Sequence, residues 1–218
     1  MHNSKFFLTE YKPHTTRLCF FKMPFQQLIS LYQKRQEELS SMWEYTFNQI
    51  PLSDDLSLQD KIAYLKPYQI NSPNRYLFSE TQSDWCLYME NGQSGTEVFG
   101  QADYLAKVWE AQFISMYLEP DYGKGEYGSV MFHWRNGANI ISEFQTEHRT
   151  IMVYKETGRV DFEESGSPLS FEDLSNYEKR LKKDRLTIEM VEEYCKYFGL
   201  QIFDLDFYKG QSNIFNIK

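Results

Sequence analysis

Cysteine is scarce in this sequence, and its few copies are not spaced for a metal or a disulfide framework. The three residues, Cys19, Cys86 and Cys195, are odd in number and include no CxxC pair. Such a pattern argues against a disulfide-stapled fold and against a zinc site. Cys86 lies in an apolar run and Cys195 in an amphipathic stretch, so we expect both to be small buried side chains.

An excess of positive charge is also absent. The chain has 23 Lys and Arg against 31 Asp and Glu, a formal net charge of −8. Binding to nucleic acid or to an anionic membrane requires basic residues gathered on one surface. The nearest approach to such a cluster, between residues 179 and 185, is interrupted by Asp184, and we interpret it as a solvated helix face. The charge therefore predicts no nucleic-acid partner and no membrane partner, and it suits a basic protein partner.

Long apolar runs are missing as well. No stretch of 18 apolar residues occurs, and the residues after Met1 are too polar for a secretory signal. We expect a cytoplasmic protein.

The residue spacings of common catalytic and metal sites are not found. The four histidines, His2, His14, His133 and His148, have no partner at HxxxH, HxH or HxxE spacing, and there is no GxSxG segment. The glycines of 92–100 are spaced wrongly for a phosphate loop. We therefore predict no metal, no cofactor and no catalytic residue, and expect that the protein is not an enzyme.

Two acidic pairs offer weak alternatives. Asp204 and Asp206 would share one face of an extended segment, as in a metal-binding DxD motif. Glu163 and Glu164 could serve as an acid and a base, but neighbouring residues of a strand point to opposite faces. We interpret both pairs as solvated charges.

Aromatic residues are abundant: 17 Phe, 16 Tyr and 4 Trp make up 17% of the chain. This density excludes a disordered chain and favours strands. Aromatic side chains that lie exposed on the surface often mark a protein interface.

The order of apolar patterns predicts a single α+β domain over residues 1–218. Residues 1–80 read as a mainly helical part with short strands at 6–9 and 17–21. Residues 85–162 read as a sheet, with turns at Asn136-Gly137 and around His148. Residues 170–208 read as two helices and an extended tail from Leu200: Ser170 with Asp173 resembles a capping box for the first helix, and Thr187 caps the second. We expect a mainly antiparallel sheet with helices packed mostly on one side.

Three blocks of the sequence resemble a group of small uncharacterised bacterial proteins. The first joins Trp85, Asn91-Gly92, Gly95-Thr96 and the Tyr104-Leu105-Ala106 stretch. The second runs from Arg159 and Phe162 through Gly166, Pro168 and Phe171-Glu172 to Tyr177. The third comprises Asp184-Arg185, Thr187, Tyr194, Gly199 and the 203–208 segment. The similarity covers residues 85–208; Val160 stands where that group tends to have Trp, and residues 1–80 match nothing in it.

That group resembles immunity proteins of bacterial toxin systems, which bind and block a cognate toxin in the producing cell. The resemblance implies an antitoxin-like inhibitor that works through protein–protein contact, with the shared blocks holding the fold and the contacts in variable loops. The alternative is an enzyme or a regulatory accessory factor with a site assembled from distant residues.

The Gly-rich segment 121–128 is the candidate contact loop. Asp121, Tyr122, Glu126 and Tyr127 combine acidic and aromatic side chains in a chain segment able to adapt to a partner. Two further glycines carry a backbone expectation: Gly158, in a turn, needs a positive φ, whereas Gly210, in the tail, does not.

Overall fold

A computed structural model describes residues 14–70, 72–92, 98–120, 128–142, 145–156 and 158–218. Its centre is a nine-stranded sheet of order β2-β9-β3-β4-β1-β5-β6-β7-β8, in which every neighbouring pair is antiparallel. The strands are β1 (Arg17–Lys22), β2 (Phe47–Leu52), β3 (Arg75–Glu80), β4 (Trp85–Glu90), β5 (Gln112–Glu119), β6 (Ser129–Ser142), β7 (Gln145–Glu156), β8 (Arg159–Gly166) and β9 (Ser212–Ile217).

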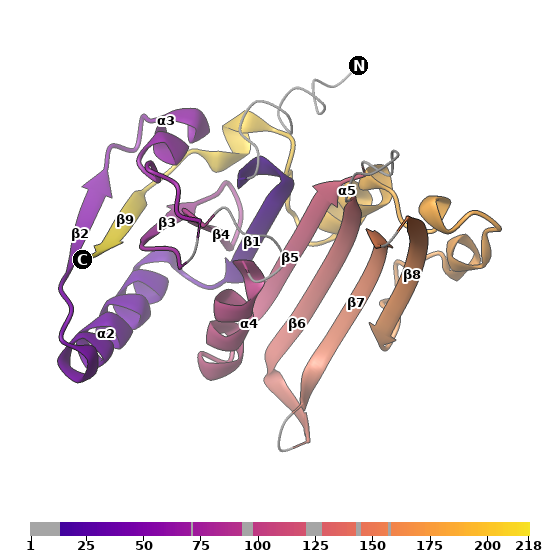
Figure 1. The fold of residues 1–218 in the computed structure, drawn as a ribbon, viewed down its shortest axis with the longest axis horizontal. Helices are drawn as coiled ribbons and strands as arrows, with labels where there is room; N and C mark the ends of the chain where they lie inside the picture. Colours follow the sequence, from indigo (N-terminus) through magenta and orange to yellow (C-terminus); the bar gives the residue numbers. More distant parts are fainter. Residues whose placement is uncertain (1–13, 71, 93–97, 121–127, 143–144, 157) are drawn as a thin grey trace.

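The helices are α2 (Phe25–Trp43), α3 (Leu58–Ala63), α4 (Val98–Val108) and α5 (Ile188–Tyr197). Short 3-10 segments are η1 (His14–Thr16), η2 (Leu174–Glu178), η3 (Lys182–Asp184) and η4 (Leu205–Tyr208). Figure 1 shows α2 and α4 in front of the sheet and α5 behind it. The α+β class and the mainly antiparallel sheet are confirmed.

The face under α2 and α4 has an aromatic core. Tyr32 of α2 packs on Phe78 and Phe215, with ring centroids 4.6 and 4.8 Å away. These rings come from three segments that are far apart in sequence, so burying them joins the two ends of the chain to its middle. Aromatic pairs at such distances add stabilisation beyond the area they bury.

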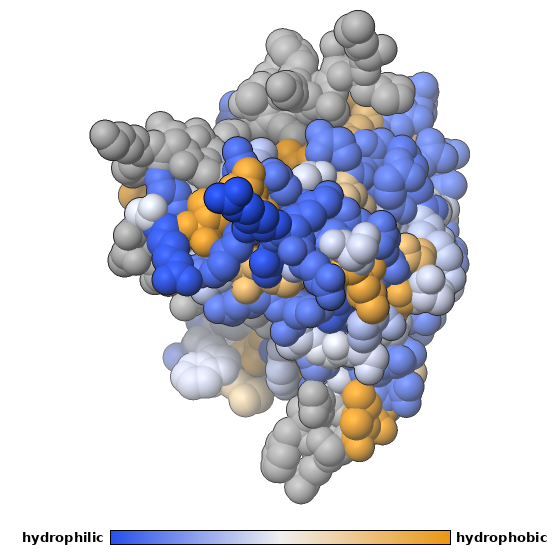
Figure 2. All heavy atoms as spheres, turned by 90° about the vertical axis from the view of Figure 1, so that its right-hand side faces the viewer, coloured by the Kyte–Doolittle hydropathy of each residue, from blue (hydrophilic) through white to orange (hydrophobic). Residues whose placement is uncertain are grey.

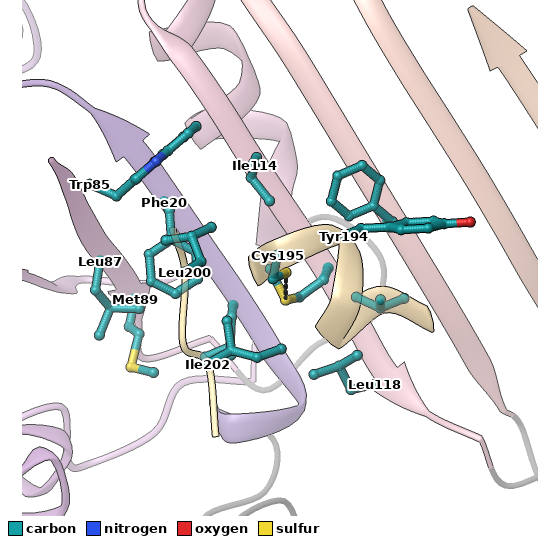
Figure 3. Close-up of a cluster of buried hydrophobic side chains, with 14 of the residues drawn as sticks. Phe20, Trp85, Leu87, Met89, Ile114, Leu118, Tyr194, Cys195, Leu200 and Ile202 are labelled. Carbon is teal, nitrogen blue, oxygen red and sulfur yellow. Dashed lines mark hydrogen bonds between the residues drawn. The ribbon is translucent and has the colours of Figure 1, made fainter. Parts of the chain in front are cut away.

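The opposite face is covered by α3, α5 and the segment after α5. Figure 3 shows Cys195, Leu200 and Ile202 over Phe20, Leu87 and Ile114 of the sheet. Cys195 is fully buried, with its Sγ 3.8 Å from the sulfur of Met116, as expected for an apolar cysteine. The helices are thus divided between the two faces, whereas most were expected on one. The central strands β3, β4 and β1 are buried on both faces and need cover on each.

Two predicted turns are wrong. β6 continues through Asn136-Gly137, with register irregularities between Asn136 and Ser142, and His148 lies within β7. Gly137 is needed for a close approach: a Cβ there would lie 2.3 Å from the carbonyl oxygen of Ala106 at the end of α4. A glycine that serves packing has the same sequence signature as one that serves a turn.

The strands at the two ends of the chain were predicted least well. The tail from Leu200 forms η4 and then β9, which pairs with both β2 and β3. β3, from Arg75 to Glu80, lies in the part that was expected to be mainly helical. The cap at Thr187 is confirmed, because its side chain accepts a hydrogen bond from the backbone N–H of Met190. The capping box that would begin at Ser170 is wrong: Asp173 itself caps the 3-10 segment η2 and accepts a hydrogen bond from the N–H of Ser175.

Among the described residues, no helix is long and apolar enough to cross a membrane.

Candidate interaction surface

The β6–β8 end of the sheet extends beyond its helical cover on one face. Figure 1 shows α4 in front of β5 and no described helix in front of β7 and β8. We call the side chains on this face of β6, β7 and β8 the open face. From the strand register they are Met131, His133, Arg135, His148, Thr150, Met152, Tyr154, Asp161, Glu163 and Ser165.

The open face combines apolar, aromatic and charged groups. Met131 and Met152 are direct cross-strand partners, and Met152 is half-buried without belonging to either hydrophobic core. Tyr154 donates a hydrogen bond of 2.6 Å to the exposed Glu163. Methionine adapts its shape to a neighbouring surface, and tyrosine joins an apolar ring to a polar tip, so both suit protein contact.

A polar network fastens α4 to the open face. Arg135 donates from Nε to Oδ1 of Asp103 at 2.6 Å and from its terminal nitrogen to Oδ2 at 2.9 Å. His133 Nε2 lies 3.1 Å from Oδ1 of the same carboxylate, and its Nδ1 lies 2.8 Å from Thr150 Oγ1. A bidentate Arg–carboxylate pair fixes the geometry as well as the charge.

Burial by itself raises the pKa of Asp103, but the hydrogen bonds from His133 and Arg135 outweigh it and leave the pKa below its ordinary value. Asp103 therefore stays ionised, and its carboxylate joins Arg135 and His133 of β6 to the helix. The network makes the open face a preorganised surface on rigid strands.

The row Thr150–His133–Asp103 has the order of a nucleophile, a base and an orienting carboxylate. Its surroundings do not complete an acyl-transfer site. Thr150 lies in mid-strand, where its backbone N–H faces β8 and that of Ile151 faces β6, so neither is directed at a bound substrate. An oxyanion requires donors that are free of the ladder. The row is better explained as part of the α4 anchor.

On the opposite face, a buried arginine fastens the segment after β8. Arg149 of β7 is 1% exposed, and it donates to both oxygens of Glu172, whose side chain is fully buried. It also donates to Glu164 of β8 at 2.5 Å. Desolvation lowers the pKa of Arg149, but the hydrogen bonds that it donates to the carboxylates of Glu172 and Glu164 outweigh this effect, and the net result is a raised pKa.

Two tyrosines extend this network. Tyr177 donates to Glu172 at 2.8 Å, and its hydroxyl lies 3.0 Å from that of Tyr194 in α5. Burial is the main cause that raises the pKa of Tyr177. The network ties β7, the 167–178 segment and α5 together, so β7 and β8 are rigid although one face is open.

The sheet ends at β8, whose second half is exposed. Figure 2 shows that the surface on this side of the molecule is mostly hydrophilic, with small hydrophobic patches. Glu163 and Glu164 point to opposite faces here, as predicted. Of the basic residues expected on a solvated helix face, Lys179, Arg180 and Lys183 are exposed, whereas two others contact β8. Lys182 contacts Asp161 at 2.5 Å, and Arg185 lies over the ring of Phe162.

A groove of about 680 Å³ lies beside α5. Its lining residues are Glu192, Lys196, Gly199, Gln201, Phe203, Asp204, Leu205 and Asp206. Asp204 accepts a hydrogen bond from the backbone of Asp206, and Asp206 pairs with Lys209 at 2.7 Å. Both carboxylates thus have partners in η4 or at its end. Across the described parts of the chain, no group of three or more His, Cys, Asp or Glu could hold a metal ion.

The predicted contact residues Asp121, Tyr122, Glu126 and Tyr127 lie outside the described residues. The residues that flank them are placed at the end of the β5–β6 pair, where Ser129 pairs with Tyr154 of the open face. Sequence reasoning missed the anchors Asp103, Arg135 and Arg149. Their partners are 32 and 23 residues away, and no local spacing reveals such pairs.

No family model, curated protein or solved structure matches this chain.

Proposed function

We propose that the protein is an immunity-type inhibitor that binds and neutralises a cognate bacterial toxin in the cytoplasm. Binding, without chemistry of its own, is the activity that the surface supports best. The resemblance of residues 85–208 to immunity proteins gives the class. The described structure adds a surface that suits protein contact.

The open face of β6–β8 is the observation that carries the proposal. It is broad, it mixes Met152 and Tyr154 with charged groups, and polar anchors hold it rigid from both sides. A preorganised surface loses little conformational entropy when it binds. Aromatic and methionine side chains surrounded by polar groups are the usual anatomy of a protein interface.

The net charge of −8 favours a basic toxin. Complementary charge mainly accelerates the encounter of two proteins. We therefore expect the association rate to fall as salt rises, with a smaller change in the dissociation rate.

The test is capture and protection with the product of the adjacent upstream gene. Tagged protein should retain that product through a wash at moderate salt, and co-expression should restore growth to cells that make the toxin. The matched control is the same chain with Met42→Lys, checked for folding by circular dichroism; Met42 is 66% exposed at the far end of α2, so this variant should still capture the toxin and protect the cells. A failure of both capture and protection, with correctly folded protein, would contradict the proposal.

A further inference from the structure

We infer that the free edge of β8 receives an extended, basic segment of the partner, which pairs with residues 162–166 as a tenth strand. This inference rests on the proposed function and specifies how the toxin is held. It concerns backbone hydrogen bonds at the sheet edge, and so differs from side-chain contact across the open face.

One hydrogen bond of β7 shows which backbone N–H and C=O groups of β8 point towards β7 and which point away from the sheet. The N–H of Lys155 donates to the carbonyl of Gly128 on the β6 side at 2.8 Å. Successive residues of a strand turn their backbone groups to alternate sides, so Tyr154 and Met152 face β8. Their partners in the register are Asp161 and Glu163.

The backbone N–H and C=O groups of Asp161 and Glu163 therefore face β7. Those of Phe162 and Glu164 point away from the sheet. Within the described residues, no backbone hydrogen bond from Phe162 or Glu164 to another element is found. An edge of this kind is a template for a further strand.

The other edge of the sheet is protected. β2 contains Pro51, which has no backbone N–H to offer. β8 contains neither proline nor lysine, the residues that commonly block an edge. Proline thus removes a backbone donor from the β2 edge, whereas every residue of β8 has a backbone N–H, and the charged side chains of its second half are all acidic.

The chemistry of the partner follows from the charges on the free half of the strand. Glu163 is exposed on the open face and Glu164 is partly exposed on the other, and no Lys or Arg lies between 162 and 166. Opposite charges directly across an antiparallel pair are stabilising. A segment with Lys or Arg opposite Glu163 therefore fits this edge.

A second copy of this chain fits less well. A two-fold axis through residue 163 or 164 would place Glu163 or Glu164 opposite its own copy, and an axis through residue 162 would place Glu163 opposite Asp161. Like charges directly across a strand pair are destabilising. The acidic residues thus disfavour self-pairing and leave the edge to a basic partner.

Hydrogen exchange at single amides tests the inference. In the free protein, the amides of Phe162 and Glu164 should exchange fast, while those of Asp161 and Glu163 are already protected. Binding of the toxin should slow exchange at Phe162 and Glu164 by about 10-fold or more, because a new ladder covers them. The amides of Gln49 and Ile50 on β2 serve as the internal control and should not change.

A second probe does not depend on the toxin. A synthetic peptide of alternating Lys and Val should protect the same two amides, and a peptide with Glu in place of Lys should not. If the toxin binds and leaves Phe162 and Glu164 unprotected, the inference is overturned while the proposed function stands. If no toxin is captured, the proposed function fails, and the peptide alone tests whether the β8 edge accepts a basic strand. Protection of the two amides by the Lys peptide then supports the inference, and the absence of protection overturns it.

Two variants separate the contribution of the backbone to binding from that of the side chain. Glu164→Pro removes the outward N–H and the contact with Arg149, whereas Glu164→Ala removes the contact alone. The proline variant should bind the toxin or the basic peptide roughly 5-fold more weakly than the alanine variant. Should Glu164→Pro not fold, Glu163→Lys replaces it, with Glu38→Lys on α2 as a control of equal charge. Equal affinities within either pair would overturn the inference.

Discussion

Arg149 and Glu172 form a buried ion pair between β7 and the segment after β8, with a terminal nitrogen of Arg149 2.8 Å from Oε2 of Glu172. Their side chains are 1% and 0% exposed. The pair holds the 167–178 segment against the sheet, so the rigidity of β7 and β8 depends on it. Removing one partner of such a pair leaves a charge with too few partners in a place without water.

Glu172→Gln should therefore lower the free energy of unfolding by about 3 kcal/mol, as removal of one partner of a buried pair does. Urea unfolding at neutral pH measures the loss. Glu178→Gln, a change at an exposed position on the same segment, is the control and should cost less than about 0.5 kcal/mol. The double change Arg149→Met with Glu172→Met should cost less than the sum of the single changes. Equal stability of the Glu172 and Glu178 variants would show that the pair has no such role.

Glu90, buried at the end of β4, should make stability depend on pH. Burial raises the pKa of its carboxyl to about 7, although a hydrogen bond from Tyr88 acts in the opposite direction. A raised folded-state pKa means that this contribution is complete below the unfolded value of about 4.5 and is lost as pH rises through 7. We expect the protein to lose up to about 3 kcal/mol between pH 4.5 and 8 from this group. The free energies of unfolding of wild type and Glu90→Gln should agree near pH 4.5, separate between pH 4.5 and 7, and differ by a constant amount above pH 8; a difference that does not change with pH would contradict the assignment.

Lys61 should have the opposite effect to Glu90: above pH 8, it should make the free energy of unfolding rise with pH. Its Nζ is buried and donates to Ser79 and to the carbonyls of Tyr208 and Gly210, and desolvation lowers its pKa to about 8. The unfolded chain then binds more protons between pH 8 and about 10.5, so stability rises with pH in that window. The gain from pH 7.5 to 9.5 should be about 2 kcal/mol in wild type and absent in Lys61→Met. A flat wild-type profile would show that the amine titrates normally.

Two glycines of β8 and its turn form a matched pair. Gly158 and Gly166 have nearly the same φ, 85° and 81°, but a Cβ at Gly158 meets nothing within 4 Å, and one at Gly166 would lie 1.9 Å from the carbonyl oxygen of His148. Gly158→Ala should cost roughly 1 kcal/mol for the left-handed backbone alone. Gly166→Ala should cost at least about 2 kcal/mol more, because β7 or β8 has to move. Thermal unfolding compares them, and equal melting temperatures would contradict the packing at Gly166.

The positive φ expected at Gly158 is confirmed, but the expectation for Gly210 is wrong. Gly210 has φ 137°, and a Cβ there would lie 2.8 Å from Cβ of Glu80. The turn dipeptide around Gly158 is a local signal, whereas the constraint on Gly210 comes from β3, which is distant in sequence. Sequence patterns register the first kind of constraint and miss the second.

The same division explains the rest of the fold. α2, α5 and the β7–β8 pair follow from local periodicity, caps and turns, and they were predicted. β9 depends on pairing with β2 and β3 across most of the chain, so its short segment has no local signature. The open face likewise depends on where α4 ends above β6, which Asp103 and Arg135 fix and which no spacing of residues encodes.

The central claim is that the open face binds a toxin, and the affinity of a Met152→Lys variant for that toxin tests it most directly. Met152 lies mid-face and outside both hydrophobic cores, so a charge there should disturb binding more than folding. Met42→Lys is the control, because Met42 is 66% exposed at the far end of α2. Calorimetric titration should show a loss of affinity of about 10-fold or more for Met152→Lys, as for a residue inside an interface, and no change for Met42→Lys. Equal affinity of both variants and wild type, with unchanged melting temperatures, would contradict the account.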